Sequence, residues 1–246
     1  MTEQRHKKIF VVSDVHGHYT QLVNALKQAG FDKDDPEHLL VCCGDCFDRG
    51  DESLEVLQFF ERLKHKVLLR GNHEDMLLKL LTTGKLLQQH RINGTFNTLN
   101  SIFGKYAIDP AGDTIDFSGK TRTVDRLCQF IEETVDYYET QNYVFVHGWL
   151  PENAETPAAR ASIPTHAWET ARLAQWIRHY DGSRPLSDKT LVCGHVPTFF
   201  AGSFDPDREK NNADIFYGNG LIAIDAGTTD SKQINVLVLE DRLIEN

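Results

Sequence analysis

The first third of the chain repeats one order of residues: an apolar run, a polar loop, and then a segment with helical periodicity. The apolar runs, which are predicted strands, are 7–13, 39–43 and 66–69. The segments with apolar residues three or four positions apart, which are predicted helices, are 19–29, 54–63 and 76–81. Alternating strands and helices predict βαβ units, whose ligand-binding loops leave the carboxyl ends of the strands.

The rest of the chain continues this pattern with longer interruptions. Helices are predicted at 122–133 and 166–180, a β-hairpin at 134–147, strands at 190–193, 221–224 and 233–239, and loops at 151–164 and 204–220. Residues 84–119 are polar with scattered apolar side chains, and we expect a mostly helical cap over the site that leads into a loop. No linker is recognisable, so residues 1–246 are expected to form a single domain of the α/β (α+β) class.

The composition argues against several classes of function. Hydrophobic residues make up 40% of the chain and charged residues 25%, as in ordinary globular proteins. The net charge of −10 argues against nucleic acid as a partner, because its binding depends on lysine and arginine contacts. No apolar run approaches the roughly 18 residues that cross a bilayer, and the N-terminus lacks a signal-peptide core. We therefore expect a cytoplasmic protein that does not contact membranes.

The cysteines are Cys42, Cys43, Cys46, Cys128 and Cys193. Cys43 and Cys46 have the spacing of a metal or redox motif, but no second pair with this spacing follows them. We expect buried free thiols beside the strands, which agrees with a reducing compartment.

Side chains that can bind metal ions stand at the ends of the predicted strands. These six residues are Asp14, His16, Asp45, Asn72, His147 and His195. One such loop could be a plain surface turn rich in Asp and Gly, but chance is a poor explanation of its repetition at successive strand ends. Carboxylate, imidazole and amide oxygen suit divalent ions, with Mn²⁺ the expected one and Fe, Zn, Co or Ni as alternatives.

Six ligands are more than one ion needs, and a shared carboxylate would divide them between two ions. Asp45 is central in the order of the ligands and is the expected bridge. The first ion would bind Asp14, His16 and Asp45, and the second would bind Asp45, Asn72, His147 and His195. Two divalent ions outweigh the charge of two aspartates and a bridging hydroxide. The site would therefore attract a phosphate group in spite of the negative net charge of the chain.

Three further residues beside these ligands suit phosphate chemistry. His73 follows Asn72, so it should face the site and supply a proton to the leaving group. Asp48 can accept a hydrogen bond from the His73 imidazolium and raise its pKa. Arg49 can donate two parallel hydrogen bonds to phosphate oxygens.

Five motifs in this order resemble the signature of the phosphoprotein phosphatase family of metallophosphoesterases, and most closely its bacterial and phage-type serine/threonine phosphatases. They are Asp14-Val-His-Gly17, Gly44-Asp-Cys-Phe-Asp-Arg-Gly50, Gly71-Asn-His-Glu74, His147-Gly148 and Gly194-His195. The resemblance spans about residues 9–195. It implies a β-sandwich of mixed sheets flanked by helices, with a dinuclear metal site at the strand ends. It also implies direct attack of a metal-activated water on phosphorus, without a phosphoenzyme.

The resemblance assigns the same roles to the residues named above: six metal ligands, His73 and Asp48 as the acid pair, and Arg49 as a phosphate-binding arginine. A second phosphate-binding arginine is expected near a tryptophan after the fourth motif. Arg172 is the preferred candidate and Arg178 the reserve. The alternative for either residue is a solvated arginine on a helix.

The chain also departs from the family in places. Trp149 stands where many members have a smaller residue, and we expect it to narrow or line the cleft. The C-terminal features of the eukaryotic enzymes are not recognisable, so their inhibitors and regulatory subunits are not expected to act here. Asp225 follows a predicted strand, where it either supports the site or simply ends a turn.

The leading hypothesis is a metal-dependent phosphomonoesterase that acts on phosphoserine or phosphothreonine in proteins, with dual specificity for phosphotyrosine possible. The alternatives are a symmetrical diadenosine tetraphosphate hydrolase or a small-molecule phosphoesterase with the same site. A catalytically silent binding protein is disfavoured, because every expected ligand and the acid pair are present.

Overall fold

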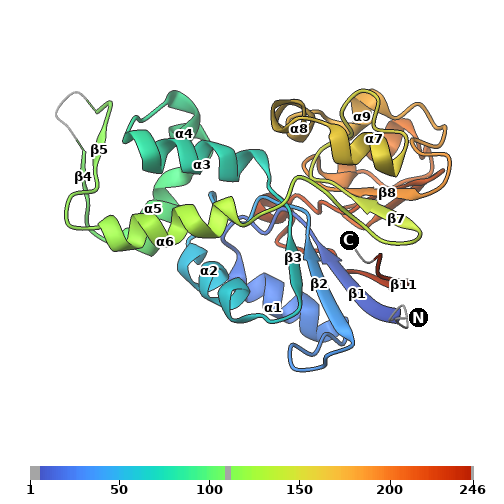
Figure 1. The fold of residues 1–246 in the computed structure, drawn as a ribbon, viewed down its shortest axis with the longest axis horizontal. Helices are drawn as coiled ribbons and strands as arrows, with labels where there is room; N and C mark the ends of the chain where they lie inside the picture. The colour runs from blue at the N-terminus through green and yellow to red at the C-terminus, as the bar shows by residue number, and fades with distance from the viewer. Residues whose placement is uncertain (1–5, 109–111, 245–246) are drawn as a thin grey trace.

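The computed structural model describes residues 6–108 and 112–244, whose strands form two sheets and a separate hairpin (Figure 1). The first sheet contains, in order, β11 (Leu237–Arg242), β1 (His6–Val12), β2 (His38–Cys42) and β3 (Lys66–Leu68). The second sheet contains β6 (Tyr138–Glu139), β7 (Tyr143–Phe145), β8 (Thr190–Cys193), β10 (Leu221–Ala223) and β9 (Phe216–Gly218). The separate hairpin pairs β4 (Ala107–Ile108) with β5 (Ile115–Asp116).

Helices lie beside both sheets. Those before β6 are α1 (Tyr19–Gln28), α2 (Ser53–Arg62), α3 (Asn72–Thr83), α4 (Gln88–Ile92), α5 (Thr95–Phe103) and α6 (Thr121–Glu132). Those after β7 are α7 (Pro157–Ser162), α8 (Thr165–Arg172), α9 (Trp176–His179), the 3₁₀ helix η1 (Thr198–Ser203) and α10 (Thr228–Ser231). Figure 1 shows α1 and α2 alongside β1, β2 and β3, and α7 and α9 near β7 and β8.

Both sheets are mixed, with parallel strands at their centres. β1, β2 and β3 pair in parallel, and so do β7, β8 and β10, whereas β11, β6 and β9 join as antiparallel strands. The carboxyl ends of parallel neighbours meet at the same edge of a sheet. The loops that follow β1, β2 and β3 therefore lie next to one another, as the sequence predicted.

The continuous apolar run of β1 is explained by burial on both of its faces. Ile9 and Val11 pack with Val192 of the second sheet in the core between the sheets. Phe10 and Val12 point the other way, into the core that the first sheet shares with the helices. A second helix-facing core includes Trp168 and Trp176 together with residues of β8 and β10. These cores make the fold a β-sandwich flanked by helices, which confirms the predicted fold class.

The predicted helix over 166–180 is wrong, because the chain turns between α8 and α9. The carbonyl of Ala171 accepts the N–H of Ala174 in a turn at 3.1 Å and the N–H of Trp149, after β7, at 3.0 Å, so it does not continue the helix. The indole of Trp176 then donates to the carbonyl of Val196 at 2.9 Å, which holds α9 against the second sheet. Hydrogen bonds to distant segments therefore end one helix and begin another.

Two predicted loops and one strand also need correction. Residues 151–164 contain α7, and residues 204–220 contain β9. The last strand begins at Leu237 and not at Gln233. Before that strand, the side-chain amide of Asn235 donates to the carbonyls of Ala213 and Ile224. These side-chain bonds hold the segment in place without β-sheet pairing.

The segment predicted as a cap, 84–119, contains α4, α5 and the β4–β5 hairpin. α5 packs against α2, and the N–H of Leu54 donates to Ser101 Oγ at 2.9 Å. The segment is therefore attached to the first half of the fold. Within residues 6–108 and 112–244, no helix is long and apolar enough to cross a lipid bilayer.

Candidate active site

The loops at the strand ends hold an unusual backbone conformation. Asp14, His16 and Asp45 have φ angles of 50°, 46° and 53°, in the left-handed region that residues with a Cβ rarely adopt. Hydrogen bonds between neighbouring loops maintain it: Asp14 N–H donates to the carbonyl of Gly44 at 3.1 Å, and His16 N–H to that of Asp45 at 2.9 Å. Backbone strain of this kind is typical of functional sites.

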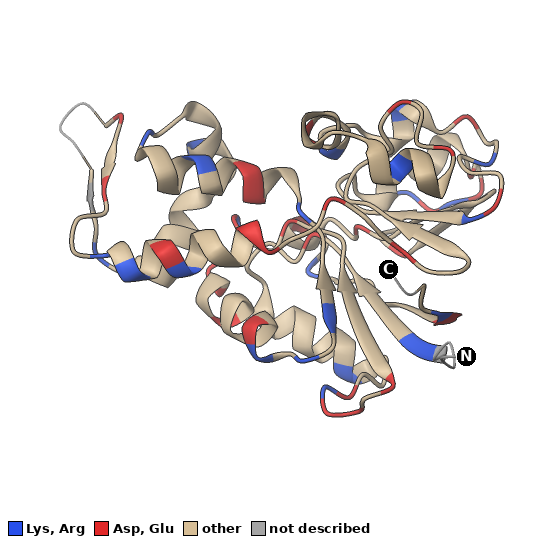
Figure 2. Ribbon diagram, in the orientation of Figure 1, with Lys and Arg blue, Asp and Glu red and all other residues tan. Residues whose placement is uncertain are grey.

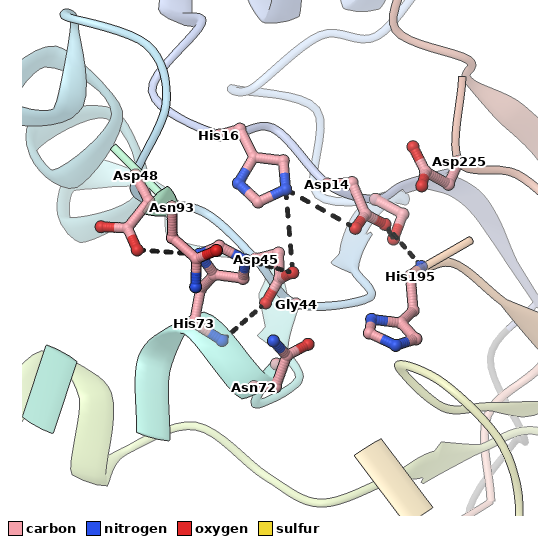
Figure 3. Close-up of polar contacts among 12 residues, drawn as sticks. Asp14, His16, Gly44, Asp45, Asp48, Asn72, His73, Asn93, His195 and Asp225 are labelled. Carbon is pink, nitrogen blue, oxygen red and sulfur yellow. Dashed lines mark hydrogen bonds and ion pairs between the residues drawn. The ribbon is translucent and has the colours of Figure 1, made fainter. Parts of the chain in front are cut away.

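The side chain of Asp45 lies at the centre of the site (Figure 3). Its Oδ2 is 3.5 Å from His147 Nε2, and 3.8 Å from Nε2 of both His16 and His73. Asp45 belongs to two groups whose potential ligand atoms lie within 4.8 Å of one another, one with His16 and His73 and one with His147 and His195. A carboxylate shared by two groups is the arrangement expected of a bridging ligand.

The remaining predicted ligands lie around these two groups. Asp14 Oδ1 is 3.9 Å from His16 Nε2, and Asp14 Oδ2 accepts a hydrogen bond from the backbone N–H of His195 at 2.9 Å. Asn72 Oδ1 is 3.0 Å from His147 Nε2. The structure therefore brings all six residues of the predicted ligand set to one place.

Two of the histidines are held by hydrogen bonds in the orientation that metal binding through Nε2 requires. His16 Nδ1 donates to the carbonyl of Phe47 at 2.8 Å, and His147 Nδ1 donates to the carbonyl of Cys43 at 2.7 Å. Because a carbonyl can only accept, both Nδ1 atoms carry a proton, and Nε2 is the nitrogen that each ring turns toward the cluster. Burial holds the pKa of His16 well below its usual value and lowers that of His195 to about 4, so both rings are neutral near pH 7.

The carboxylates of the cluster create a need for positive charge. Asp14 and Asp45 are buried, and burial raises the pKa of Asp14. Burial would also raise the pKa of Asp45, but His147, His73 and His16 hold it below its usual value. Two buried carboxylates beside imidazole nitrogens form a set that fits divalent metal ions.

His73 differs from the other histidines in the partner of its Nδ1 atom. This atom donates to Asp48 Oδ2 at 2.8 Å, and the Asp48 side chain is fully buried. Burial lowers the pKa of His73, but the negative charges of Asp45 and Asp48 outweigh burial and raise the pKa to about 9. His73 is therefore a charged imidazolium near pH 7, which can donate a proton.

Glu74, the last residue of the third motif, has a structural role that was not predicted. Its carboxylate accepts hydrogen bonds from the backbone N–H groups of Asp45, Cys46 and Gly71, each at 2.8 Å. Burial raises its pKa to about 7. Gly71 permits this packing, since a Cβ there would lie 2.1 Å from Asp45 Oδ1. The sequence signal was a glutamate at the third position of a helix, which is typical of a capping box.

Asp225 lies beside Asp14 in Figure 3. It is buried, and burial together with the charge of Asp14 raises its pKa well above the usual value. One of its oxygens accepts the N–H of Gly227 at 2.7 Å, so Asp225 does end a turn, and it also faces the cluster.

The candidate phosphate-binding arginines lie in different environments. Arg49 is exposed, and none of the hydrogen bonds or ion pairs within the described ranges holds its guanidinium. Arg172 is buried: Nε donates to Asp75 at 2.8 Å and Nη1 donates to Asp136 at 2.6 Å. The guanidinium of Arg172 is therefore already paired with two carboxylates. Arg178, on α9, is exposed. Trp149 is half-buried and stacks on His179.

A groove of about 520 Å³ begins beside Asn72. Its lining combines both signs of charge with apolar side chains: Arg70, Asn72, Asp75, Met76, Leu78, Lys79, Thr82, Glu132, Glu169 and Leu173. No aromatic ring is among these lining residues. Figure 2 shows both blue and red segments on α3.

The sequence matches the model of a known family along most of its length. Residues 7–224 match the family described as calcineurin-like phosphoesterase. The chain belongs to this family. It is therefore a member of the metallophosphoesterases, hydrolases that use divalent metal ions, and the predicted family resemblance is confirmed.

Proteins named for different activities are similar to this chain. Serine/threonine-protein phosphatase 2 of Salmonella typhimurium is 28% identical over 203 residues, which cover 81% of this chain and 84% of that protein. The symmetrical bis(5'-nucleosyl)-tetraphosphatase of Methylococcus capsulatus is 26% identical over 180 residues, which cover 72% of this chain and 56% of that protein. A protein serine/threonine phosphatase structure from Saccharomyces cerevisiae has a TM-score of 0.56 at 15% identity, covering 98% of this chain and 81% of that chain, and shows the fold alone.

Proposed function

We propose that this metallophosphoesterase is a serine/threonine protein phosphatase. The observation that carries the proposal is the charged His73–Asp48 pair directly beside the cluster centred on Asp45. Hydrolysis of a phosphomonoester needs both parts, because the cluster would hold the ions that activate the attacking water and His73 would protonate the leaving oxygen.

Two divalent ions, most suitably Mn²⁺, are proposed to bind the cluster. The first would be held by Asp14, His16 and Asp45, and the second by Asp45, Asn72, His147 and His195. When bound, the ions would activate water and stabilise negative charge on the phosphate. The protein supports this binding by presenting neutral imidazole nitrogens and buried carboxylates, as described above.

Residues outside the cluster are proposed to handle the substrate. The exposed guanidinium of Arg49 would donate to phosphate oxygens, and His73 would give its proton to the serine or threonine oxygen that leaves. Arg172, the second predicted phosphate ligand, would have to release Asp75 and Asp136 before it could contact phosphate. Arg178 is exposed and does not carry this cost, and it remains the reserve candidate for the second contact.

The groove beside Asn72 supports a protein substrate over a dinucleotide. Its mixed charges and apolar side chains suit a polypeptide segment next to the phosphorylated residue, whereas an adenine base is usually held by aromatic stacking. The phosphatase of Salmonella typhimurium also aligns with more of this chain than the tetraphosphatase of Methylococcus capsulatus does. That tetraphosphatase nevertheless makes diadenosine tetraphosphate hydrolysis the second candidate function, and a small-molecule phosphoesterase would use the same groups.

A substrate panel with added Mn²⁺ tests the proposal. Phosphoserine and phosphothreonine peptides, a phosphotyrosine peptide, diadenosine tetraphosphate and small phosphomonoesters should be compared by kcat/KM. We expect the phosphoserine and phosphothreonine peptides to exceed the dinucleotide by at least about tenfold. A higher value for diadenosine tetraphosphate would favour the second function, and no turnover of any substrate would favour a silent binding protein.

A further inference from the structure

Helix α5, in the segment between α3 and α6, contacts the acid pair formed by His73 and Asp48. The side chain of Thr95, the first residue of α5, is buried, and its hydroxyl donates to Asp48 Oδ2 at 2.9 Å. The same Asp48 oxygen accepts the hydrogen bond from His73 Nδ1. Three residues further along α5, Thr98 Oγ1 accepts the backbone N–H of Asp48 at 2.7 Å and lies 3.3 Å from Asp48 Oδ1. α5 therefore holds both the carboxylate and the backbone of Asp48.

The same segment also supports the residue that follows Asp48. Asp48 and Arg49 have φ angles of 69° and 65°, so two successive residues are in the left-handed region. The amide of Asn97 donates to the carbonyl of Arg49 at 2.5 Å. Gly94 packs so closely that a Cβ there would lie 2.9 Å from Arg49 Cα. Such a conformation is kept only where the surroundings hold it, and here α5 and the turn before it do so.

We propose that Thr95 is a positioning residue for the leaving-group acid, an inference that rests on the function proposed above. Asp48 can orient the ring of His73 only while its own carboxylate cannot rotate. Thr95 supplies a donor to the oxygen that His73 uses. Removing that donor leaves a buried carboxylate less satisfied, and rotation toward other partners would relieve this cost. The N-terminal part of α5, with the turn before it, is thus a structural part of the active site.

Valine and serine at position 95 separate the hydroxyl from the shape of the side chain. Thr95→Val keeps the volume but removes the donor, and Thr95→Ser keeps the donor. With phenyl phosphate, whose leaving group needs a proton, we expect Thr95→Val to lower kcat about tenfold at an unchanged KM. With p-nitrophenyl phosphate, an activated ester, the loss should be below about twofold. Thr95→Ser should stay within about twofold of the unmodified protein with both substrates.

Ser101→Ala is the matched control on the same helix. Ser101 Oγ accepts the N–H of Leu54 on α2, so its loss loosens α5 without touching Asp48. This variant should leave the ratio of the two substrates unchanged. Thermal melting and Mn²⁺ content should show that all the variants are folded and loaded. An equal loss with both substrates in Thr95→Val, or the same change of ratio in Ser101→Ala, would overturn the proposal.

A crystal structure of Thr95→Val gives a readout that does not depend on activity. We expect the Asp48 carboxylate to rotate and its 2.8 Å hydrogen bond with His73 to lengthen or break. An unchanged Asp48–His73 geometry would refute the positioning role even in an active enzyme. If the unmodified protein hydrolysed no phosphoester but Asp48 rotated as expected, the proposed function would fail, and only the structural hold of Thr95 on Asp48 would be confirmed.

Discussion

Two parts of the active site contain buried histidines of opposite character. His16, in the metal-type cluster, and His73, in the acid pair, both have Nε2 at 3.8 Å from the same Asp45 oxygen. The pKa of His16 is well below its usual value because of burial, whereas that of His73 is raised to about 9 by carboxylates that outweigh burial. The local difference is the partner of Nδ1, which is the Phe47 carbonyl for His16 and the Asp48 carboxylate for His73.

This difference shows how one kind of side chain can serve two chemical roles in one site. A neutral carbonyl behind the ring selects a tautomer and leaves a lone pair free for a metal ion. A carboxylate behind the ring stabilises the imidazolium and keeps a proton available. The partner of the far nitrogen therefore matters as much as the position of the ring.

The largest effect is expected from Asp45→Asn, because Asp45 contacts both the metal-type cluster and His73 of the acid pair. The variant should lose most of its bound metal and more than about a thousandfold in kcat/KM, because the residue lies in both ligand groups. Elemental analysis after metal loading measures this directly. Two ions per chain in the variant would remove the bridging assignment.

His73→Asn should break the acid pair and leave the cluster intact. We expect kcat to fall by about 10² to 10⁴ with poor leaving groups, at a similar KM and an unchanged metal content. With activated aryl phosphates the loss should be much smaller. Equal losses on both kinds of substrate would show that His73 is not the proton donor.

Asp48→Asn should change the charge of His73 more than its place. The acid acts only when protonated, so the rate with poor leaving groups should decline as the pH rises through the pKa of His73. That pKa is about 9 in the metal-free protein, and bound cations would lower it. Without the Asp48 charge the pKa falls, so the declining limb of the pH–rate profile should move to lower pH. If the declining limb stayed at the same pH, the titrating group would be a residue other than His73.

The smallest effect on rate is expected from the arginines, and it should differ between them. Arg49→Ala should raise KM for phosphomonoesters by about tenfold, because a charge-assisted contact with phosphate is lost. Arg172→Ala should chiefly lower the melting temperature, because it leaves Asp75 and Asp136 without their partner. Kinetics and thermal melting of both variants would reveal a reversal of these roles.

The positions of the cluster residues were predictable because backbone geometry decides them. Asp14, Asp45 and Asn72 follow successive parallel strands, and such strands end at one edge of a sheet. The fold class was predictable for a related reason, since apolar runs flanked by helical periodicity specify buried strands. The roles of these residues as metal ligands remain predictions.

Other contacts were not predictable, because they join segments that are distant in the sequence. The direction of the Arg172 side chain depends on Asp75 of α3 and on Asp136 before β6, and no local pattern contains that information. Thr95 likewise meets Asp48 from 47 positions away. Helical spacing predicted α8 but could not show where the loop after β7 would end it.

The state of the histidine rings in the metal-free protein tests the central contrast most directly. Nitrogen-15 NMR of the imidazoles at about pH 7 distinguishes neutral from charged rings, and His16→Asn and His73→Asn would assign the signals. We predict protons on both nitrogens of His73, and on Nδ1 alone in His16. A neutral His73 or a charged His16 at that pH would contradict the account.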